Sequence, residues 1–184
     1  MASAFTHAFV GTVIGKAFKA GRKMPARFWV GLAVCAAFPD VDVIGYWFGV
    51  PLDSPWGHRG FTHSILFAGV LAWVGIELLF RKEKRFSKSW WVLLVCFFIA
   101  CVSHGMLDAC TDGGHGITFF WPFDNTRYFF PFRPIAVSPL GISRFYGERG
   151  VRIIESELLW VWLPTILIYF IWRVGRGFVF GKKD

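Results

Sequence analysis

The chain has 184 residues, of which 55% are hydrophobic, 20% are aromatic and only 17% are charged. Soluble domains carry about 25% charged residues, so this composition excludes an ordinary soluble globular protein. The formal net charge is +8, but the Lys and Arg residues stand in short patches between apolar runs. That pattern is typical of membrane topology signals and not of a nucleic-acid-binding surface. We therefore expect residues 1–184 to form a single membrane-embedded helical domain without a nucleic-acid partner.

Five apolar segments are predicted to form helices that enter or cross a bilayer, because about 20 helical residues span its hydrocarbon core. In chain order they are Ala2–Phe18, Phe28–Val50, Thr62–Phe80, Ser89–Cys110 and Glu157–Val174. The first is short and lacks the preceding basic residues of a cleaved signal peptide, so we expect it in the mature protein. The second contains Pro39, which prevents regular helix at that point. The predicted fold class is all-α, an integral membrane helical bundle of about five helices.

Three basic patches predict the orientation of this bundle. They lie between the first and second segments, between the third and fourth, and after the fifth, and comprise Lys16, Lys19, Arg22, Lys23 and Arg27; Arg81, Lys82, Lys84, Arg85 and Lys88; and Arg173, Arg176, Lys182 and Lys183. All three share one side if every segment crosses, and short loops rich in Lys and Arg stay in the cytoplasm. We therefore expect the N-terminus, the loop from Pro51 to Gly60 and the long segment of residues 111–156 to face outward.

The segment of residues 111–156 is aromatic and interrupted by prolines, as in "ITFFWPFDNTRYFFPFRPIAVSPLG". It is too broken to span a bilayer, so we expect an interfacial lid or membrane-docking element, a setting that favours Trp and Tyr. Its Arg127, Arg133 and Arg144 either steer an anionic substrate or meet lipid headgroups. The four cysteines lie in or beside apolar runs without paired spacing and are expected to pack as small apolar residues, free of disulfides.

Ionisable residues from four separate segments fall at one predicted depth. Counted from the basic patches, they lie roughly 20 to 30 Å along their helices, near the outward surface. They are His7, Asp40, His63, His104 and Asp108. An unpaired ionisable group in a membrane costs about 3 kcal/mol or more, whereas a shared cation cancels the carboxylate charge. Histidine nitrogen and aspartate oxygen are ordinary Zn²⁺ ligands, so the pattern suggests a metal site on this face.

The stretch "SHGMLDACTDGGH" contains the most specific of these patterns. His104 and Asp108 are four residues apart on a predicted helix, so both side chains project from one face and can bind one ion. His115 follows where glycines end the helix and is a further candidate ligand. The alternative is a buried hydrogen bond between His104 and Asp108. In "AFPDVDVIG", Asp40 and Asp42 follow the proline break and suit a cation, and the alternative is a solvated turn.

The stretch "HRGFTHS" places two histidines and an arginine before the third segment. Thr62 or Ser64 is expected to cap that helix, which leaves His58 and Arg59 in the preceding turn. A helix N-terminus attracts anions, and Arg59 has a planar fork suited to phosphate oxygens. The alternative is an interfacial loop in which His58 and His63 face lipid headgroups.

His7 shares a helical stripe with Gly11 and Gly15. Small residues at this spacing let helices approach closely, so we expect this face to point into the bundle. His7 is then either a metal ligand or a hydrogen-bonded core residue.

The order of "TH", "PDVD", "HRGFTHS", "HGMLD" and a later "WPF" resembles the YdjM-like family of bacterial membrane-bound metal-dependent hydrolases. More distantly, HxxxD followed by a further histidine is similar to the zinc-dependent phospholipase C and P1 nuclease group. That resemblance implies one metal held by Asp40, His104, Asp108 and one histidine of the HRGFTH element, His58 or His63. It also implies a second metal at His7 and a bridging Asp108. His115 is the one match for a third site, so two Zn²⁺ ions, or another divalent metal, are the expected cofactors.

The predicted function is therefore a metal-dependent hydrolase of the bacterial inner membrane, acting on a phosphoester of a lipid or small molecule at the outer leaflet. Asp40 or Asp42 is expected to accept a proton from water, and Arg59 to hold the phosphate. One alternative is a metal-ion or proton-coupled transporter, but such sites usually lie near the midplane between repeats, and the sequence shows no clear repeat. A third is a non-catalytic membrane protein with a structural metal.

Overall fold

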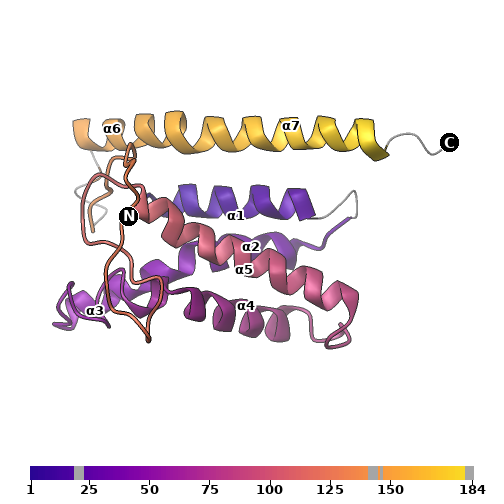
Figure 1. Ribbon diagram of the computed structural model, residues 1–184, viewed down its shortest axis with the longest axis horizontal. Coiled ribbons are helices and arrows are strands. Elements are labelled where there is room, and N and C mark those ends of the chain that lie inside the picture. Colours follow the sequence, from indigo (N-terminus) through magenta and orange to yellow (C-terminus); the bar gives the residue numbers. More distant parts are fainter. Residues whose placement is uncertain (19–22, 141–144, 146, 181–184) are drawn as a thin grey trace.

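The computed structural model describes residues 1–18, 23–140, 145 and 147–180. In Figure 1 the longer helices run nearly side by side: α1 (Ala4–Phe18), α2 (Ala26–Ala37), α4 (Ile65–Leu79), α5 (Lys88–Ala109) and α7 (Leu163–Phe180). Helix α6 (Glu148–Glu157) continues through the π-helical turn η4 (Leu158–Trp162) into α7. The short elements are η1 (Phe38–Asp42), α3 (Val43–Trp47) and η2 (Phe61–His63). The described residues contain helices and two isolated β-bridges, which confirms the all-α bundle.

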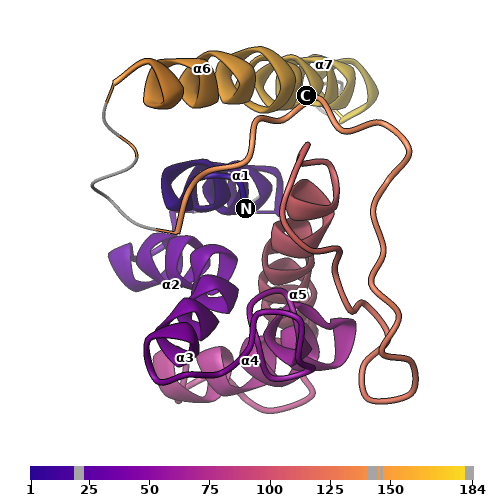
Figure 2. The ribbon, with the colours of Figure 1, turned by 90° about the vertical axis from the view of Figure 1, so that its left-hand side faces the viewer.

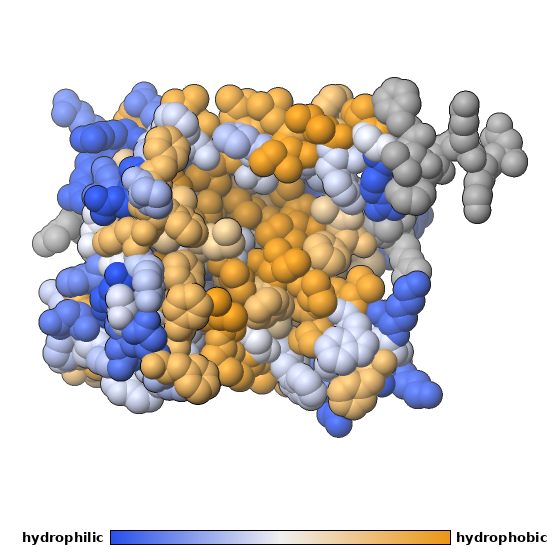
Figure 3. Space-filling model, viewed as in Figure 1, coloured by the Kyte–Doolittle hydropathy of each residue, from blue (hydrophilic) through white to orange (hydrophobic). Residues whose placement is uncertain are grey.

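Three helical stretches of the described chain are long and apolar enough to cross a membrane. They are Ala26–Trp47, Lys88–Ala109 and Glu148–Arg176, and α4 is a shorter apolar helix. Apolar side chains form a belt across the middle of the bundle, with hydrophilic residues gathered towards its two ends (Figure 3). Of the arginines and lysines used in the topology prediction and the interfacial segment, Lys19, Arg22, Arg144, Lys182 and Lys183 lie outside the described residues.

The breaks in the second and third segments follow from their local sequence. Helix α2 ends at Ala37, and the chain passes through the 3₁₀ turn η1, because Pro39 has no N–H to donate to a regular α-helix. The third helix begins at Ile65, with His63 in the preceding 3₁₀ turn. Of the two predicted caps, Ser64 takes the role: its side chain accepts a hydrogen bond from the Phe67 amide at 3.1 Å.

The fifth helix begins nine residues earlier than predicted, at Glu148 and not at Glu157. The outward segment expected over residues 111–156 therefore ends as α6 begins. The reason is amphipathicity: α6 buries Gly150, Ile153 and Glu157 at helical spacing, while its other charged residues are exposed. A prediction from mean hydropathy misses such a helix because its charged residues lower the mean hydropathy.

The helices pack through small residues and a shared apolar core. An added Cβ at Gly11 would lie 2.6 Å from Ala36 Cβ, so the predicted glycine stripe does bring α1 against α2. Viewed from the end, α1 lies between the α6–α7 helix and the group formed by α2, α4 and α5 (Figure 2). The core of that group includes Phe28, Leu32, Ala72, Ile76, Trp90 and Phe97. The four cysteines are free thiols, as predicted.

Candidate metal centre

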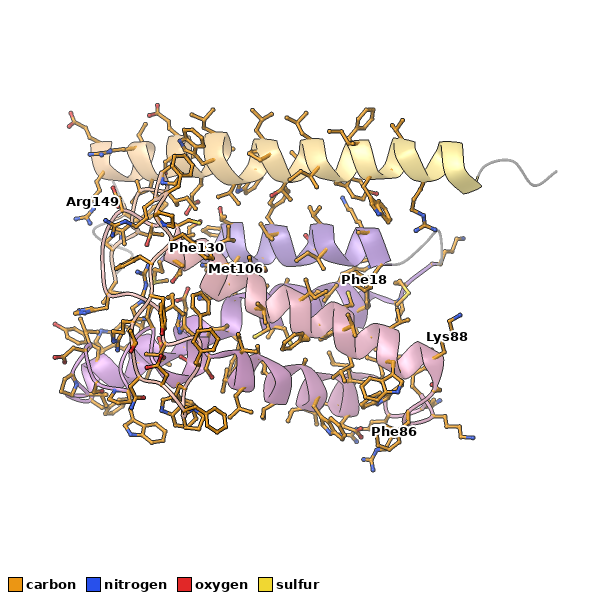
Figure 4. All side chains as sticks on the ribbon, in the orientation of Figure 1. Phe18, Phe86, Lys88, Met106, Phe130 and Arg149 are labelled. Atoms are coloured by element: carbon orange, nitrogen blue, oxygen red, sulfur yellow. The ribbon has the colours of Figure 1, made fainter. Side chains whose placement is uncertain are left out.

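Five of the predicted ligands meet at the end of the bundle where α5 finishes. Asp40 comes from η1, His63 from η2, His7 from α1, and His104 and Asp108 from successive turns of α5. Met106 lies between the last two in the sequence, and Figure 4 shows it at this end, far from Lys88 at the start of the same helix. The convergence predicted from helical depth is therefore present.

Four of these side chains form a compact group of possible ligand atoms. His104 Nε2 lies 3.1 Å from His63 Nε2 and 3.3 Å from Asp40 Oδ1. The distance from His63 Nε2 to Asp40 Oδ1 is 3.6 Å, and Asp108 Oδ2 lies 3.8 Å and 3.9 Å from the ring nitrogens of His63 and His104. Ligand atoms around a tetrahedral Zn²⁺ are about 3.3–3.6 Å apart, given bonds of about 2.0–2.2 Å. The group has nearly the dimensions of such a shell.

Hydrogen bonds on the far side of each ring fix which nitrogen faces this group. His104 Nδ1 lies 2.7 Å from the Ala36 carbonyl oxygen, which can only accept, so Nδ1 is the protonated nitrogen of the neutral ring. His63 Nδ1 lies 3.0 Å from Thr62 Oγ1 and 3.2 Å from Asp42 Oδ2. When both rings are neutral, as metal binding requires, the two Nε2 atoms present lone pairs to each other at 3.1 Å. Lone pairs repel at this distance, and a cation between them removes the conflict.

Three carboxylate oxygens of the group also lack a hydrogen bond. Both oxygens of Asp40 and Oδ2 of Asp108 are buried without a hydrogen bond among the described residues. Buried carboxylate oxygens without donors are costly, and a metal ion is one of the few ways to satisfy them. The donor set of two imidazoles and two carboxylates therefore fits Zn²⁺.

His7 lies against the same group from the other side. Its ring stacks on His104 with centroids 3.7 Å apart, and both its nitrogens are buried without a hydrogen bond among the described residues. His7 Nε2 lies 3.3 Å from Asp108 Oδ1 and 4.0 Å from Asp40 Oδ2. Asp108 thus presents one oxygen to the four-residue group and the other to His7, while Oδ1 also accepts a hydrogen bond from the Ala2 amide at 2.7 Å.

Asp42 lies behind the imidazoles and not beside Asp40. Its Oδ1 lies 2.7 Å from His58 Nδ1, and its Oδ2 accepts hydrogen bonds from Thr62 Oγ1 at 2.5 Å and from the Arg59 amide at 3.1 Å. Asp42, His58 and His63 have the spacing of a second ligand group, but these contacts have the length of hydrogen bonds. Burial lowers the pKa of His58, and the hydrogen bond to Asp42 opposes this only in part. Asp42 therefore orients both histidines.

Arg59 occupies a different place from the predicted phosphate site. Its side chain is fully buried and its φ is +67°. Nη1 donates to the carbonyls of Gly113 and His115, Nη2 donates to Thr111 Oγ1, and Nε lies 3.3 Å from Asp108 Oδ2. The guanidinium therefore holds residues 111–115 against the loop of His58, Arg59 and Gly60 (the HRG loop) and balances the charge of Asp108.

The remaining predicted ligand, His115, belongs to neither ligand group. Its side chain is exposed, and its backbone carbonyl is the part that contacts Arg59. The described residues contain two ligand groups, neither of which includes it. The glycines around His115 allow the chain to turn outward, which the sequence spacing alone did not reveal.

Glu157 was not identified as functional from the sequence, and Arg127, predicted to steer an anionic substrate or meet lipid headgroups, contacts backbone carbonyls instead. Glu157 is buried and accepts hydrogen bonds from the Ser3 amide, Ser3 Oγ and Thr6 Oγ1. It fastens the end of α6 to the start of α1, next to the amide that contacts Asp108. Arg127 donates to the carbonyls of His58, Gly116, Leu52 and Ser54, so it holds the interfacial segment on the loop. The signal for Glu157 was an acidic residue at the edge of an apolar run.

Comparison with known proteins identifies the family. A family model described as "YdjM inner membrane protein" matches residues 1–178. The chain belongs to this family. It is also 36% identical over 168 residues to "Inner membrane protein YbcI" of Escherichia coli (strain K12), an alignment that covers 91% of this chain and 95% of that protein. No solved structure shows a significant match. The family and the apolar helices establish an inner membrane protein, whereas hydrolase activity and a metal remain predictions.

Proposed function

We propose that this member of the family is a metal-dependent hydrolase of a phosphoester, with a lipid as the favoured substrate. The observation that carries the proposal is the pair of imidazole Nε2 atoms 3.1 Å apart, closed into a four-ligand group by Asp40 and Asp108. These four residues would hold one Zn²⁺. His7 and the second oxygen of Asp108 would face a second ion.

The chain's own residues have distinct roles in this proposal. Bound Zn²⁺ supplies Lewis acidity and lowers the pKa of a coordinated water to about 7. Asp40 is the most accessible of the four ligand residues, with a side chain 9% exposed. Its Oδ1 faces the two histidines and would hold the ion, and its Oδ2, which has no hydrogen-bond donor among the described residues, would accept the proton. Asp42 orients His58 and His63, and Arg59 holds Asp108 in position.

Exposed aromatic side chains at the end of the bundle that holds the four-ligand group (from here on, the metal group) favour a lipid substrate. Trp47 and Phe48 follow Asp42 at the end of α3 and are 70% and 82% exposed. Trp56, just before His58, is 60% exposed, and Phe123 of the interfacial segment is 92% exposed. Large aromatic residues on a membrane protein concentrate at the lipid–water interface. The described basic residues between α1 and α2 and between α4 and α5 lie at the opposite end of the bundle. Basic loops mark the cytoplasmic side, so the proposed active face is periplasmic.

A second candidate function rests on burial. The side chains of His7, His63, His104 and Asp108 are 0% exposed. A closed four-ligand shell is typical of structural zinc, whereas catalytic zinc keeps an open position. The second candidate is therefore a non-catalytic membrane protein whose metal holds η1, η2 and α5 together.

Elemental analysis of the purified protein, combined with turnover of phospholipids and isoprenoid phosphates, tests both candidates. The variants are Asp108→Ala and, as a matched control, Asp112→Ala, which removes an exposed carboxylate outside the ligand group. Metal and turnover in the wild type and the control, with both lost in Asp108→Ala, would support the hydrolase. Bound metal without turnover of any phosphoester would support the structural role. A protein without transition metal would refute both.

A further inference from the structure

We propose that an anionic phospholipid binds in a cavity at the end of the bundle opposite the metal group. The cavity has a volume of about 550 Å³ and lies where the end of α1 meets the first turns of α2 and α5. Figure 4 shows two of its lining residues, Phe18 and Lys88, at the end far from Phe130 and Arg149. Its volume is within the range of small-molecule sites, about 300–1,000 Å³. None of the residues that line it belongs to the metal group.

The floor of the cavity is apolar. It is built from buried side chains of α2, α5 and the residue after α4, namely Phe28, Leu93, Cys96 and Phe80. Burying a hydrocarbon chain here removes apolar surface from contact with water or headgroups, at about 25 cal/mol per Å². The floor therefore suits an acyl chain, and a small inorganic anion gains nothing from it.

The rim of the cavity is cationic. Lys23, Arg27 and Lys88 are exposed; the first precedes α2, the second lies in the first turn of α2, and the third begins α5. The Arg27 guanidinium lies over the Phe80 ring, 5.3 Å from its centroid, so its charge stays above the floor. Glu83 is the one carboxylate among the lining residues, and its Oε2 accepts a hydrogen bond from Ser89 Oγ at 2.8 Å. Three cations against one carboxylate leave the rim positive.

The combination of a positive rim and an apolar floor selects the class of ligand. Lys88, which lines the cavity, stands at this end of the bundle (Figure 4), where the apolar belt gives way to hydrophilic residues (Figure 3). This is the level of lipid headgroups. A phosphate headgroup at the rim would place its acyl chain against the floor. The chemistry that fits both features is an anionic glycerophospholipid in the leaflet on the basic side of the bundle.

Native mass spectrometry and thermal unfolding of the full chain test this inference. The protein is placed in phosphatidylcholine nanodiscs with and without phosphatidylglycerol. The variant Arg27→Gln/Lys88→Gln removes two rim charges, and Lys82→Gln/Lys84→Gln is the matched control, with the same charge change in exposed residues that do not line the cavity. Val92→Trp narrows the cavity without a charge change. Pure phosphatidylcholine discs show whether each variant folds.

We expect phosphatidylglycerol to be retained by the wild type and the control, and to bind on the order of 25-fold more weakly to the rim variant. Val92→Trp is expected to weaken binding as well. Equal losses in the rim variant and the control would show attraction to general surface charge and overturn the inference. So would unchanged binding in Val92→Trp, or stabilisation of the wild type by inorganic phosphate or glycerol phosphate as strong as that by the lipid.

Discussion

The substitution Asp42→Asn tests whether Asp42 orients the histidines or acts directly as a metal ligand or proton acceptor. The substitution keeps the shape of the side chain but replaces one oxygen with an NH₂ group. Both oxygens of Asp42 accept: Oδ1 faces His58 Nδ1, and Oδ2 faces Thr62 Oγ1 and the Arg59 amide. Whichever way the amide turns, a donor faces a donor, so at least one imidazole or loop contact is lost.

The expected loss can be estimated from the position of Asp42 behind His63. Replacing a residue that orients a metal-binding histidine typically weakens metal affinity by about 10- to 100-fold. That range corresponds to about 1.4–2.8 kcal/mol, at about 1.4 kcal/mol per tenfold change. Zinc at saturating concentration should therefore stabilise the variant by that much less than it stabilises the wild type. The metal-free protein should lose a further 1–3 kcal/mol or so, because a buried donor is left without an acceptor.

The assay is competition with a chromophoric zinc chelator, followed by thermal unfolding with EDTA and with excess zinc. Asp53→Asn is the control, because Asp53 is an exposed carboxylate of the same loop outside both ligand groups. The reasoning would be refuted if Asp42→Asn bound zinc with wild-type affinity. Complete loss of metal, equal to that in a ligand variant, would show that Asp42 is itself a ligand.

Three further predictions concern the site and its supports. His104→Ala should abolish the high-affinity metal and any phosphoesterase activity, as measured by elemental analysis and substrate turnover; full metal occupancy in this variant would contradict the assignment of this ring. Gly11→Ala should lower the free energy of unfolding by about 1–3 kcal/mol, because the added Cβ would lie 2.6 Å from a side chain of α2. Gly69→Ala, where the nearest atom is 4.0 Å away, should not lower the thermal stability, because alanine favours a helix more than glycine does. Glu157→Gln should lower the free energy of unfolding by about 1.5–3 kcal/mol, because its hydrogen bonds to α1 become weaker. It should also change the fluorescence of Trp162, which contacts α1. An unchanged unfolding curve would show that Glu157 does not hold α6 on α1.

Properties that repeat along a helix could be predicted from the sequence. Apolar runs of sufficient length gave the membrane bundle, and the four-residue spacing of His104 and Asp108 placed both on one face of α5. Counting the rise from the basic patches gave the common depth of His7, Asp40 and His63. These inferences succeed because helical rise and rotation per residue are constant, so position along the chain translates directly into position in space.

The tertiary structure decided everything that depends on where a loop turns. In the structure Asp42 lies behind the histidines, the Arg59 guanidinium binds residues 111–115, and the side chain of His115 is exposed. The direction of a loop side chain is set by contacts with residues far away in the sequence, such as those between Arg127 and the carbonyls of the HRG loop. The sequence thus determined which residues reach the end of the bundle. Packing between the segments decided which of them face one another, because no local periodicity specifies those contacts.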